Sequence, residues 1–437
     1  MHTNTMTTHD ILQQYRQKIG TTVKTDFKDP ATLALARTIA SELIRAAADF
    51  QELVALEKQT TASDLKSSLP NLLHLAVKLA RSRASVLGSR PFHASIILPA
   101  YGENIRMKER GTGPGQHPNG ENFIIEKSKQ LQWLFAGSPS TYEVTIVDDM
   151  SKPDPETSGQ AAADVIAKAD TPHFQVLFLE DGVRNEKRGD AIVARALIGV
   201  EHPKNTKKAG AVYYGIAKAI EKHGTADSHV IVLTDCDLSV DIGQLGNLAN
   251  PILNAAAMAA AGSRRLPESI LEIEAARNLR ANTARYFREL LLKGLLPKDT
   301  QCGAKAFAAA ALNEVISSGM QILDFSFDIE LLTKIALQFS PGKVVPVAVA
   351  WFDSAELTTT DSSVHFNIMK AQLAIAKSNH TGSGPVFDEA VAVSEHLTSD
   401  ESVWLKLLDN LKDQPTIIER VQSFDPAALS ELKALSV

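Results

Sequence analysis

Cysteine and long apolar runs are both scarce in this sequence. Only two cysteines, Cys236 and Cys302, occur in 437 residues, so a disulfide framework is excluded and a reducing compartment is favoured. The most apolar stretch, 250–262, is alanine-rich and shorter than the roughly 20 residues that a membrane-spanning helix needs. The amino terminus lacks the basic-then-apolar order of a secretory signal. We therefore expect a cytoplasmic protein.

An excess of positive charge is also lacking. Lys and Arg number 45 against 51 Asp and Glu, which gives a formal net charge of −6. A protein that mainly binds the nucleic-acid backbone is expected to be basic, so nucleic acid is not an expected partner. The hydrophobic share of 44% and the charged share of 22% are typical of globular proteins and exclude disorder for the chain as a whole. At this length, more than one packing unit is expected.

The two ends of the chain show helical spacing. Within residues 1–88, Asp29 and Pro30 have the positions of an N-cap and a first-turn proline before a long helical pattern. A second pattern covers 71–87, and neither carries a cluster of polar residues suited to chemistry. We interpret this region as a helical appendage for packing or oligomerisation, with substrate binding as the alternative. The tail, 379–437, is predicted to form two or three amphipathic helices that dock on the core or make a homodimer contact.

Short apolar runs alternate with helical patterns in the middle of the chain, which we assign to one domain over 89–378. This alternation predicts an α/β fold, in which a mostly parallel sheet is covered by helices on both faces. Ligands of such sheets bind beyond the carboxyl ends of the strands. The predicted strands are His93–Ala100, Tyr142–Asp148, Phe174–Leu179 and His229–Leu233, and the predicted helices are Phe123–Phe135, Ser158–Ala169 and Gly210–His223.

Acidic residues follow three of these strands. The first strand runs into Glu103, the second ends at Asp148 and Asp149, and Asp235 and Asp237 follow the fourth. Carboxylates gathered at one sheet edge would repel one another, and a divalent cation would relieve that repulsion. Hard oxygen ligands suit Mg²⁺ or Mn²⁺, which proteins hold with one or two carboxylates plus substrate phosphates. Asp235 and Asp237 are therefore the predicted metal ligands.

Further polar segments each allow two interpretations. Asp148 and Asp149 either hold a base or ribose or cap the next helix. Lys208 opens a helix, where it either attracts phosphate or belongs to a solvated lysine pair. Arg264 and Arg265 either neutralise a diphosphate or make surface ion pairs.

Two later segments are also candidates. Residues 299–305 gather polar side chains around Gly303, which is too polar a pattern for a strand core. Asp324 and Asp328 precede or begin a helical pattern, where an aspartate is either a cap or a catalytic base.

The order of these segments resembles a known family. Between about His93 and Phe366 the chain contains, in order, IILPAYGEN, VTIVDDMS, KKAGAVYYGI, VLTDCDLSVD, GSRR, DTQCGAKAF and FDIELLTKIA. This part resembles the GT-A-fold glycosyltransferases of family 2 and is most similar to the dolichyl-phosphate glucosyl- and mannosyltransferase type. The resemblance implies a Rossmann-like nucleotide-diphospho-sugar transferase sheet, extended here by helices at both ends.

The resemblance also implies roles for individual residues. It assigns Asp235 and Asp237 to the metal that bridges the donor diphosphate, and His365 to a third ligand position found in some GT-A enzymes. Arg264 or Arg265 would assist the leaving diphosphate. The residues expected beside the donor nucleotide are Pro99, Tyr101, Glu103, Asp148, Asp149 and Lys208. The residues expected on the sugar and acceptor side are Asp299, Gln301 and the base, which is Asp328 or Asp324.

The chain also departs from the family pattern. Residues 104–122 form a long insertion rich in Gly and Pro, which we expect to act as a flap over donor or acceptor. A second insertion covers 181–206. The membrane helices of the relatives have no counterpart here, so a lipid-phosphate acceptor is less expected than a small molecule or glycan.

The favoured hypothesis is therefore a metal-dependent glycosyltransferase. It would move a sugar from a UDP- or GDP-sugar to a hydroxyl or phosphate acceptor, with inversion as the family expectation. A sugar-phosphate nucleotidyltransferase is one alternative, although the glycine-rich signature usual after its first strand is distorted here. A non-catalytic nucleotide-sugar-binding scaffold is the other, and the presence of both Asp235 and Asp237 argues against it.

Overall fold

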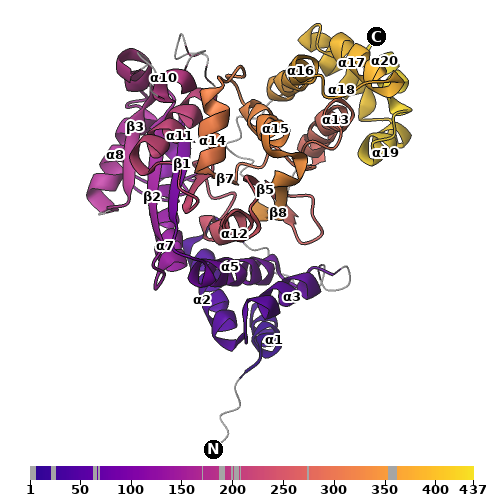
Figure 1. Cartoon of the computed structure of the whole chain (residues 1–437). Coiled ribbons are helices and arrows are strands. Elements are labelled where there is room, and N and C mark those ends of the chain that lie inside the picture. Colours follow the sequence, from indigo (N-terminus) through magenta and orange to yellow (C-terminus); the bar gives the residue numbers. More distant parts are fainter. Residues whose placement is uncertain are drawn as a thin grey trace, which may run out of the picture.

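The computed structural model has three parts in sequence order (Figure 1): helices of the amino-terminal region, a sheet with its covering helices, and a carboxyl-terminal group of helices. The described residues are 6–20, 26–62, 66, 69–169, 171–186, 192–197, 200, 206, 208–272, 275–352 and 362–437.

The amino-terminal region is helical, as predicted. The Asp29 carboxylate accepts the Thr32 N–H at 2.9 Å, which confirms the predicted N-cap. Asp49 accepts the Glu52 N–H at 2.9 Å and starts a new helix, so the long helical pattern is two helices rather than one. The helices are α1 (Thr8–Ile19), α2 (Pro30–Ala46), α3 (Phe50–Thr60) and α5 (Asn71–Gly88).

A seven-stranded sheet forms the centre, in the order β3-β2-β1-β4-β7-β5-β8. Only β7 runs antiparallel to its neighbours, which confirms a mostly parallel sheet. The four predicted strands form with ends within one residue of those expected. The strands are β1 (His93–Ala100), β2 (Thr141–Asp148), β3 (Phe174–Phe178), β4 (His229–Leu233), β5 (Ala259–Ser263), β7 (Lys305–Ala308) and β8 (Val344–Ala348); β6 (Ile270–Glu272) and β9 (Ala350–Phe352) pair separately.

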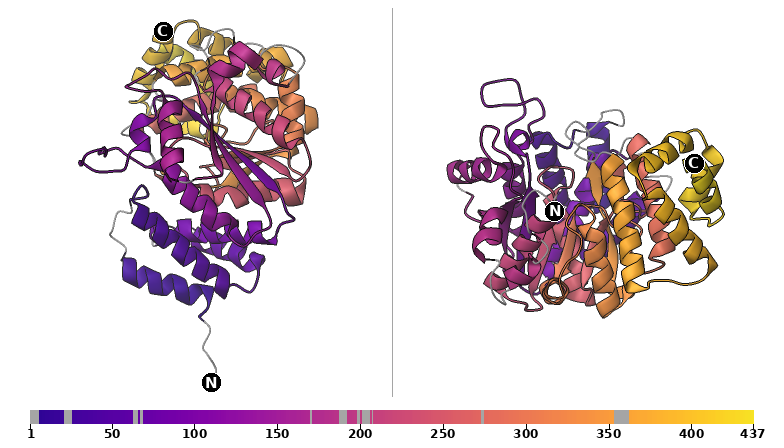
Figure 2. Two further views of the ribbon diagram at one scale, coloured as in Figure 1. Left: turned by 90° about the vertical axis from the view of Figure 1, so that its left-hand side faces the viewer. Right: turned by 90° about the horizontal axis from the view of Figure 1, so that it is seen from above.

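Helices cover both faces of this sheet, which Figure 2 shows face-on as a twisted fan. Successive residues of β1 point to opposite faces, so Ile96 and Leu98 pack in one core cluster and Ile97 in another. The first cluster includes residues of α7 (Phe123–Phe135), α8 (Ser158–Ala169) and α12 (Leu245–Ala255). The second includes residues of α10 (Ile192–Ala196), α11 (Ala209–His223), α14 (Ala309–Ser317) and α15 (Phe327–Phe339).

The carboxyl-terminal helices share a third core cluster, with Trp404 fully buried inside it. The tail was predicted to contain two or three helices, whereas the structure has four there. Two helices from earlier in the chain and Ile329 of α15 join the same cluster, so this packing extends upstream of residue 379. Its helices are α13 (Ala275–Leu291), α16 (Ser362–Asn379), α17 (Pro385–Leu397), α18 (Glu401–Leu411), α19 (Pro415–Ser423) and α20 (Ala428–Ser436).

Short helical turns complete the chain. They are α6 (Asn104–Met107), α9 (Leu179–Asp181), η1 (Gly182–Glu186), η3 (Ile242–Gln244) and η4 (Pro341–Lys343). Asp241 accepts the Gly243 N–H at 2.7 Å and caps the start of η3. Within the described residues, no helix combines the length and apolar character needed to span a bilayer.

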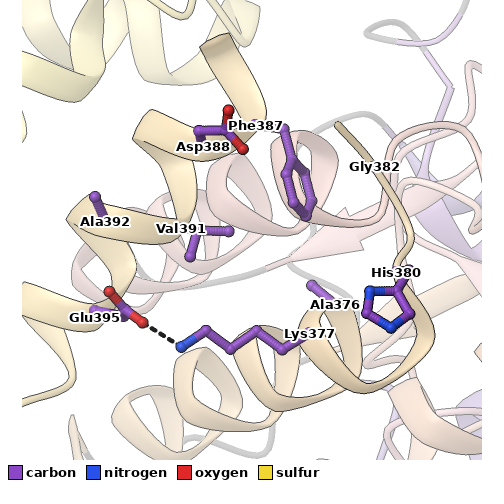
Figure 3. Close-up of a pocket in the computed structure, with 9 residues that line it drawn as sticks. All are labelled: Ala376, Lys377, His380, Gly382, Phe387, Asp388, Val391, Ala392 and Glu395. Atoms are coloured by element: carbon purple, nitrogen blue, oxygen red, sulfur yellow. Dashed lines mark hydrogen bonds and ion pairs between the residues drawn. The ribbon is translucent and has the colours of Figure 1, made fainter. Parts of the chain in front are cut away.

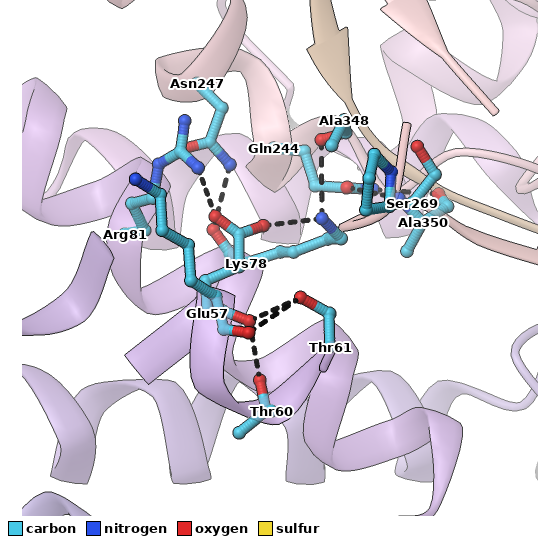
Figure 4. Close-up of polar contacts among 12 residues, drawn as sticks. Glu57, Thr60, Thr61, Lys78, Arg81, Gln244, Asn247, Ser269, Ala348 and Ala350 are labelled. Carbon is cyan, nitrogen blue, oxygen red and sulfur yellow. Dashed lines mark hydrogen bonds and ion pairs between the residues drawn. The ribbon is translucent and has the colours of Figure 1, made fainter. Parts of the chain in front are cut away.

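A buried ion pair joins the amino-terminal helices to the sheet (Figure 4). The Lys78 ammonium donates to Glu57 Oε1 at 2.5 Å, and Arg81 also pairs with the Glu57 carboxylate. Lys78 is fully buried, and its ammonium lies 3.4 Å from the Ala348 carbonyl oxygen at the end of β8. The amino-terminal helices thus share a continuous core with one face of the sheet.

Replacing Lys78 with methionine tests this ion pair. Methionine keeps most of the buried volume but leaves the Glu57 carboxylate with Arg81 as its remaining cationic partner. We expect the free energy of unfolding in urea to fall by about 3–5 kcal/mol, the cost of breaking a buried pair. Lys412→Met removes an exposed pair with Asp409 and should cost about 1 kcal/mol or less. Equal effects of the two variants would contradict the structural role of Lys78.

A buried histidine on the same helix predicts a pH dependence of stability. Burial lowers the pKa of His74 to about 4, and the positive charge of Lys78 acts in the same direction. The unfolded chain therefore takes up this proton near pH 6.5, whereas the folded chain takes it up only near pH 4. Acidification through this window favours unfolding, by up to about 1.4 kcal/mol per pH unit. We expect His74→Gln to flatten the fall in unfolding free energy between pH 6.5 and 4, and an unchanged slope would disprove this effect.

Candidate functional site

The carboxyl ends of β1, β2 and β4 lie side by side in the sheet, and one lysine connects the residues that follow them. Lys208, just before α11, donates its backbone N–H to Asp149 Oδ2 at 2.5 Å. Its ammonium binds Asp235 Oδ1. The predicted nucleotide residue Asp149 and the predicted metal ligand Asp235 therefore belong to one site.

The backbone of Lys208 adopts an unfavourable conformation. Its φ of 88° lies in the left-handed region, where a non-glycine residue costs about 1–3 kcal/mol. Burial disfavours the ammonium, but the carboxylates of Asp235, Asp328 and Asp237 raise the pKa of Lys208 above its ordinary value. Lys208 is thus a permanent positive charge held against the loop that follows β4. This loop, residues 235–237, is called the acidic loop below because it contains Asp235 and Asp237.

The acidic loop orients its two aspartates differently from the residue between them. Cys236 is buried with its thiol 3.4 Å from the Pro99 carbonyl oxygen, whereas Asp235 and Asp237 are partly exposed. Asp237 accepts hydrogen bonds from the Ser239 N–H and hydroxyl, both at 3.0 Å. A side chain on Gly303 would collide with the Asp235 carboxylate, since its Cβ would lie 1.9 Å from Oδ2. Gly303 therefore makes room for Asp235.

The two aspartates have opposite pKa shifts. Burial acts to raise the pKa of Asp235, but the Lys208 ammonium outweighs it and the pKa is lowered. Burial and the charge of Asp235 raise the pKa of Asp237. Burial, aided by the charges of Asp237 and Asp235, also raises the pKa of Glu103 to about 7, against the effect of Arg106. The loop carries more negative charge than its cationic neighbours offset.

The insertion 104–122 connects directly to this loop. Glu121 accepts the Leu238 N–H at 2.7 Å, and Arg106 binds Glu103 at 2.6 Å. Figure 2 shows the middle of the insertion as a purple loop that projects from the body of the molecule. Arg110 anchors it to Asp26 of the amino-terminal region at 2.6 Å. Its proposed action as a flap stays a prediction.

Asp328 lies in the first turn of α15, and its charge acts on Lys208. Lys305 of β7 binds its carboxylate at 3.0 Å and is itself almost fully buried. Burial raises the pKa of Asp328, although Lys305 and Lys208 oppose this. Asp324 instead accepts the Ser326 N–H at 2.7 Å, as a turn residue does. Asp328 is therefore the better placed of the two candidate bases.

Arg264 is committed to a protein carboxylate. Its guanidinium binds Asp299 through Nε at 2.8 Å and Nη2 at 2.9 Å. The backbone N–H of Arg264 donates a third hydrogen bond to the same carboxylate at 2.9 Å. This pairing outweighs burial and lowers the pKa of Asp299 well below its usual range. Gln301 donates its N–H to Asp299 at 3.3 Å, and its side-chain nitrogen is buried without a hydrogen-bond partner. Asp299 thus orients Arg264, whereas the amide nitrogen of Gln301 has an unused hydrogen-bond donor.

A group of arginines lies beside this pair. Burial lowers the pKa of Arg285 to about 10, and the positive charges of Arg265 and Arg288 add to the effect. Burial likewise lowers the pKa of Arg265; Asp299 opposes this shift, and Arg264 and Arg288 add to it. Cations that destabilise one another in this way would be stabilised by a bound anion.

Asp148 has a structural role. Its carboxylate accepts the Ser151 N–H at 2.8 Å, the Ser151 hydroxyl at 2.6 Å and the Gly159 N–H at 2.5 Å. Gly159 lies in the first turn of α8, so Asp148 caps the following helix, which is the alternative considered from the sequence. The carboxylate that accepts the Lys208 N–H belongs instead to Asp149. Burial raises the pKa of Asp149 to about 6.

Three other predicted residues, Pro99, Tyr101 and His365, differ in how deeply they are buried. Pro99 is buried in β1 and contributes its carbonyl, whereas Tyr101 is 52% exposed. His365 is buried in α16, and the described residues contain no group of three or more His, Cys, Asp or Glu that could hold a metal. The structure therefore does not join His365 to the two aspartates, because α16 packs with the carboxyl-terminal helices.

Asp235 and Asp237 fit a hard divalent cation. Both supply carboxylate oxygens, and a positive charge already lies on Asp235 in the form of the Lys208 ammonium. Mg²⁺ and Mn²⁺ commonly use one or two carboxylates and take their remaining ligands from phosphate and water. Two aspartates without a third protein ligand are compatible with such an ion.

Two hollows in the structure lie away from this site. One, of about 410 Å³, lies between α16 and α17 and is lined by residues that include Lys377, Phe387 and Glu395 (Figure 3). The other, of about 290 Å³, lies beside Glu57 and Arg81. Neither contains a predicted site residue. The side chains of Asp235 and Lys208 reach solvent instead, with exposures of 34% and 24%.

Sequence reasoning missed the cations that balance the site. Arg106 and Lys305 pair with Glu103 and Asp328, and neither received a role from the sequence. A lysine at the start of a buried strand was the available signal for Lys305. Glu121, which accepts the Leu238 N–H, was also missed. It lies at the end of a glycine-rich insertion, where the sequence pattern does not indicate a contact with another loop.

Comparisons with known proteins gave structural likeness only. No family model and no curated protein sequence matches the chain. Mannosyl-3-phosphoglycerate synthase from Rubrobacter xylanophilus is 14% identical, with a TM-score of 0.44 over 71% of this chain and 80% of that one. Glucosyl-3-phosphoglycerate synthase from Mycobacterium tuberculosis, in complex with Mn²⁺ and UDP-glucose, is 12% identical, with a TM-score of 0.43 over 70% of this chain and 84% of that one. At this level of likeness, the function proposed below depends on the chain's own residues.

The capping role of Asp148 can be tested by its removal. Asp148→Ala leaves the N–H groups of Ser151 and Gly159 without an acceptor, so we expect the free energy of unfolding to fall by about 1.5–3 kcal/mol. Hydrogen exchange of these two amides should accelerate. Asp164→Ala, which removes an exposed carboxylate from the same helix, should stay within about 0.5 kcal/mol of wild type. Unchanged amide protection in Asp148→Ala would contradict the cap.

Proposed function

We propose that this chain is a metal-dependent glycosyltransferase of the GT-A type that transfers a sugar from a nucleoside diphosphate sugar. The observation that supports it most is the double contact of Lys208 with Asp149 and Asp235. It unites a strand-end aspartate suited to a nucleotide with the Asp-x-Asp loop suited to its diphosphate. The edge at which they meet is where ligands of parallel sheets bind.

The donor would lie along the carboxyl ends of β2, β1 and β4. Asp149 and Tyr101 would contact the nucleoside, and Asp235 and Asp237 would hold Mg²⁺ or Mn²⁺. When bound, this cation offsets the negative charge of the departing diphosphate. The donor is a UDP- or GDP-sugar, and the buried amide of Gln301 is suited to a sugar hydroxyl.

Asp328 is the proposed base. Its carboxylate would accept the proton of the acceptor hydroxyl, and a raised pKa brings its basicity nearer to neutral pH. Lys305 holds it in position at 3.0 Å. A base on the acceptor side is the arrangement expected of an inverting transfer.

The proposed acceptor is a small anionic molecule. Arg265 and Arg285 support this class, because burial and the charges of neighbouring arginines lower the pKa of both, while Arg264 pairs with Asp299 and Arg288 with Glu289. The Mycobacterium tuberculosis enzyme has been crystallised with phosphoglyceric acid and with glycerol 3-phosphate. The motif order remains most similar to the dolichyl-phosphate type, but an anionic small molecule suits these arginines without a lipid.

Donor hydrolysis tests the proposal without knowledge of the acceptor. UDP- and GDP-sugars should be cleaved slowly with Mn²⁺, and chelation should stop the reaction until Mn²⁺ is restored. Asp235→Ala and Asp237→Ala should each lose roughly 100-fold or more, because charge on the leaving group is no longer offset, as when other groups that stabilise transition-state charge are removed. Asp164→Ala is the control and should keep wild-type activity.

Other outcomes would identify other functions. Near-normal turnover by both aspartate variants would overturn the metal-dependent mechanism. Release of pyrophosphate from a nucleoside triphosphate and a sugar phosphate would instead identify a nucleotidyltransferase. Binding of nucleotide sugars without turnover on any acceptor would identify a scaffold.

A further inference from the structure

Lys208 and the proposed cation require the same carboxylate. The Lys208 ammonium binds Asp235 Oδ1, and its charge also acts on Asp237 and Asp328. A divalent cation held by Asp235 and Asp237 would lie beside this ammonium. Two positive charges at one partly buried carboxylate repel each other with little screening by salt. The inference below rests on the proposed function.

The main chain of Lys208 is held by hydrogen bonds within the fold, whereas its side chain is partly exposed. Its N–H is bound to Asp149, and the N–H of the next residue, Ala209, donates to the Thr206 carbonyl at 2.7 Å. Ala209 and Gly210 are buried, and a Cβ on Gly210 would lie 2.6 Å from the Thr206 side chain. The main chain is therefore fixed at this point. The flexible four-carbon stem carries the ammonium, and 24% of the side chain is exposed.

We propose that Lys208 competes with the divalent cation for Asp235, and that the donor diphosphate ends this competition by drawing the ammonium to itself. Without nucleotide, the ammonium neutralises Asp235 and keeps the cation weakly bound. With nucleotide, the phosphates supply new negative charge within reach of the same side chain. Asp235 then becomes available to the cation, which the phosphates also bind.

This exchange makes cation and nucleotide binding cooperative. By thermodynamic linkage, the factor by which nucleotide tightens the cation equals the factor by which the cation tightens nucleotide. The two would therefore enter together as a complex, and the empty enzyme would not retain free divalent cation. Lys208 acts here as a regulatory residue on metal binding.

Mn²⁺ binding measured by electron paramagnetic resonance tests the proposal on the full chain. Titrations would be run with and without UDP or GDP, with a correction for Mn²⁺ held by free nucleotide. For wild type we expect nucleotide to tighten Mn²⁺ at least tenfold. Lys208→Met should bind Mn²⁺ alone at least tenfold more tightly than wild type and gain less than threefold from nucleotide.

Two further variants serve as controls. Lys208→Arg keeps the positive charge and should bind Mn²⁺ alone as weakly as wild type. Lys222→Met removes an ion pair with Glu143 at the opposite end of α11 and should match wild type throughout. Calorimetry on wild type, which needs no variant, should find that Mn²⁺ tightens the nucleotide by the same factor.

The outcomes separate this inference from the proposed function. Equal Mn²⁺ affinity of Lys208→Met and wild type without nucleotide would overturn the competition alone, as would the absence of coupling in wild type. Unchanged Mn²⁺ binding in Asp235→Asn would instead remove Asp235 as a metal ligand and overturn both proposals.

Discussion

One lysine compensates two carboxylates that the sheet brings together. Through its backbone N–H and its ammonium, Lys208 binds Asp149 after β2 and Asp235 after β4. These residues are 59 and 27 positions away along the chain. The start of α11 is fixed by this double contact, at the cost of an unfavourable φ. The position of the helix and the charge state of the acidic loop are therefore determined by the same residue.

The remaining charges of the site are arranged in local pairs. Glu103 pairs with Arg106, Asp328 with Lys305, and Asp299 with Arg264. Glu103 and Arg106 are three positions apart, whereas each of the other two pairs joins separate segments. Each pair holds the carboxylate side chain in place. Among the described residues, no ion pair is formed by Asp237 or by Arg285 of α13, whereas Arg288 of the same helix pairs with Glu289, so the site has one acidic and one basic region. This separation of charge is consistent with the proposed transfer from an anionic donor to an anionic acceptor.

The sequence predicted what depends on local pattern. Strand β1 and helix α7 have the predicted ends, because apolar runs and helical spacing are encoded within each segment. The break between α2 and α3 was missed because a single aspartate, Asp49, outweighs a continuous helical pattern.

Features that depend on packing between distant segments were beyond such reasoning. Whether an aspartate caps a helix or faces another charged group depends on which segment packs above it, so the sequence favoured Asp149 for the nucleotide but left the capping role of Asp148 open. His365 has a plausible residue type and chain position, but α16 packs with the carboxyl-terminal helices. The same limit hid the partnership of Lys305 with Asp328.

Helix α13 belongs to two neighbourhoods at once. Its Tyr286 hydroxyl donates to the Asp425 carbonyl oxygen at 2.9 Å, and Arg285 lies over the Phe424 ring, both contacts being with the carboxyl-terminal helices. Its Arg288 donates to the Thr300 hydroxyl at 2.9 Å, beside the Asp299 that holds Arg264. The orientation of these guanidinium groups therefore depends on contacts with the carboxyl-terminal region, which lies outside the sheet. Under the proposed function, substitutions in the tail would change the orientation of these guanidinium groups, and with it acceptor preference, while the aspartates at the strand ends stay unchanged.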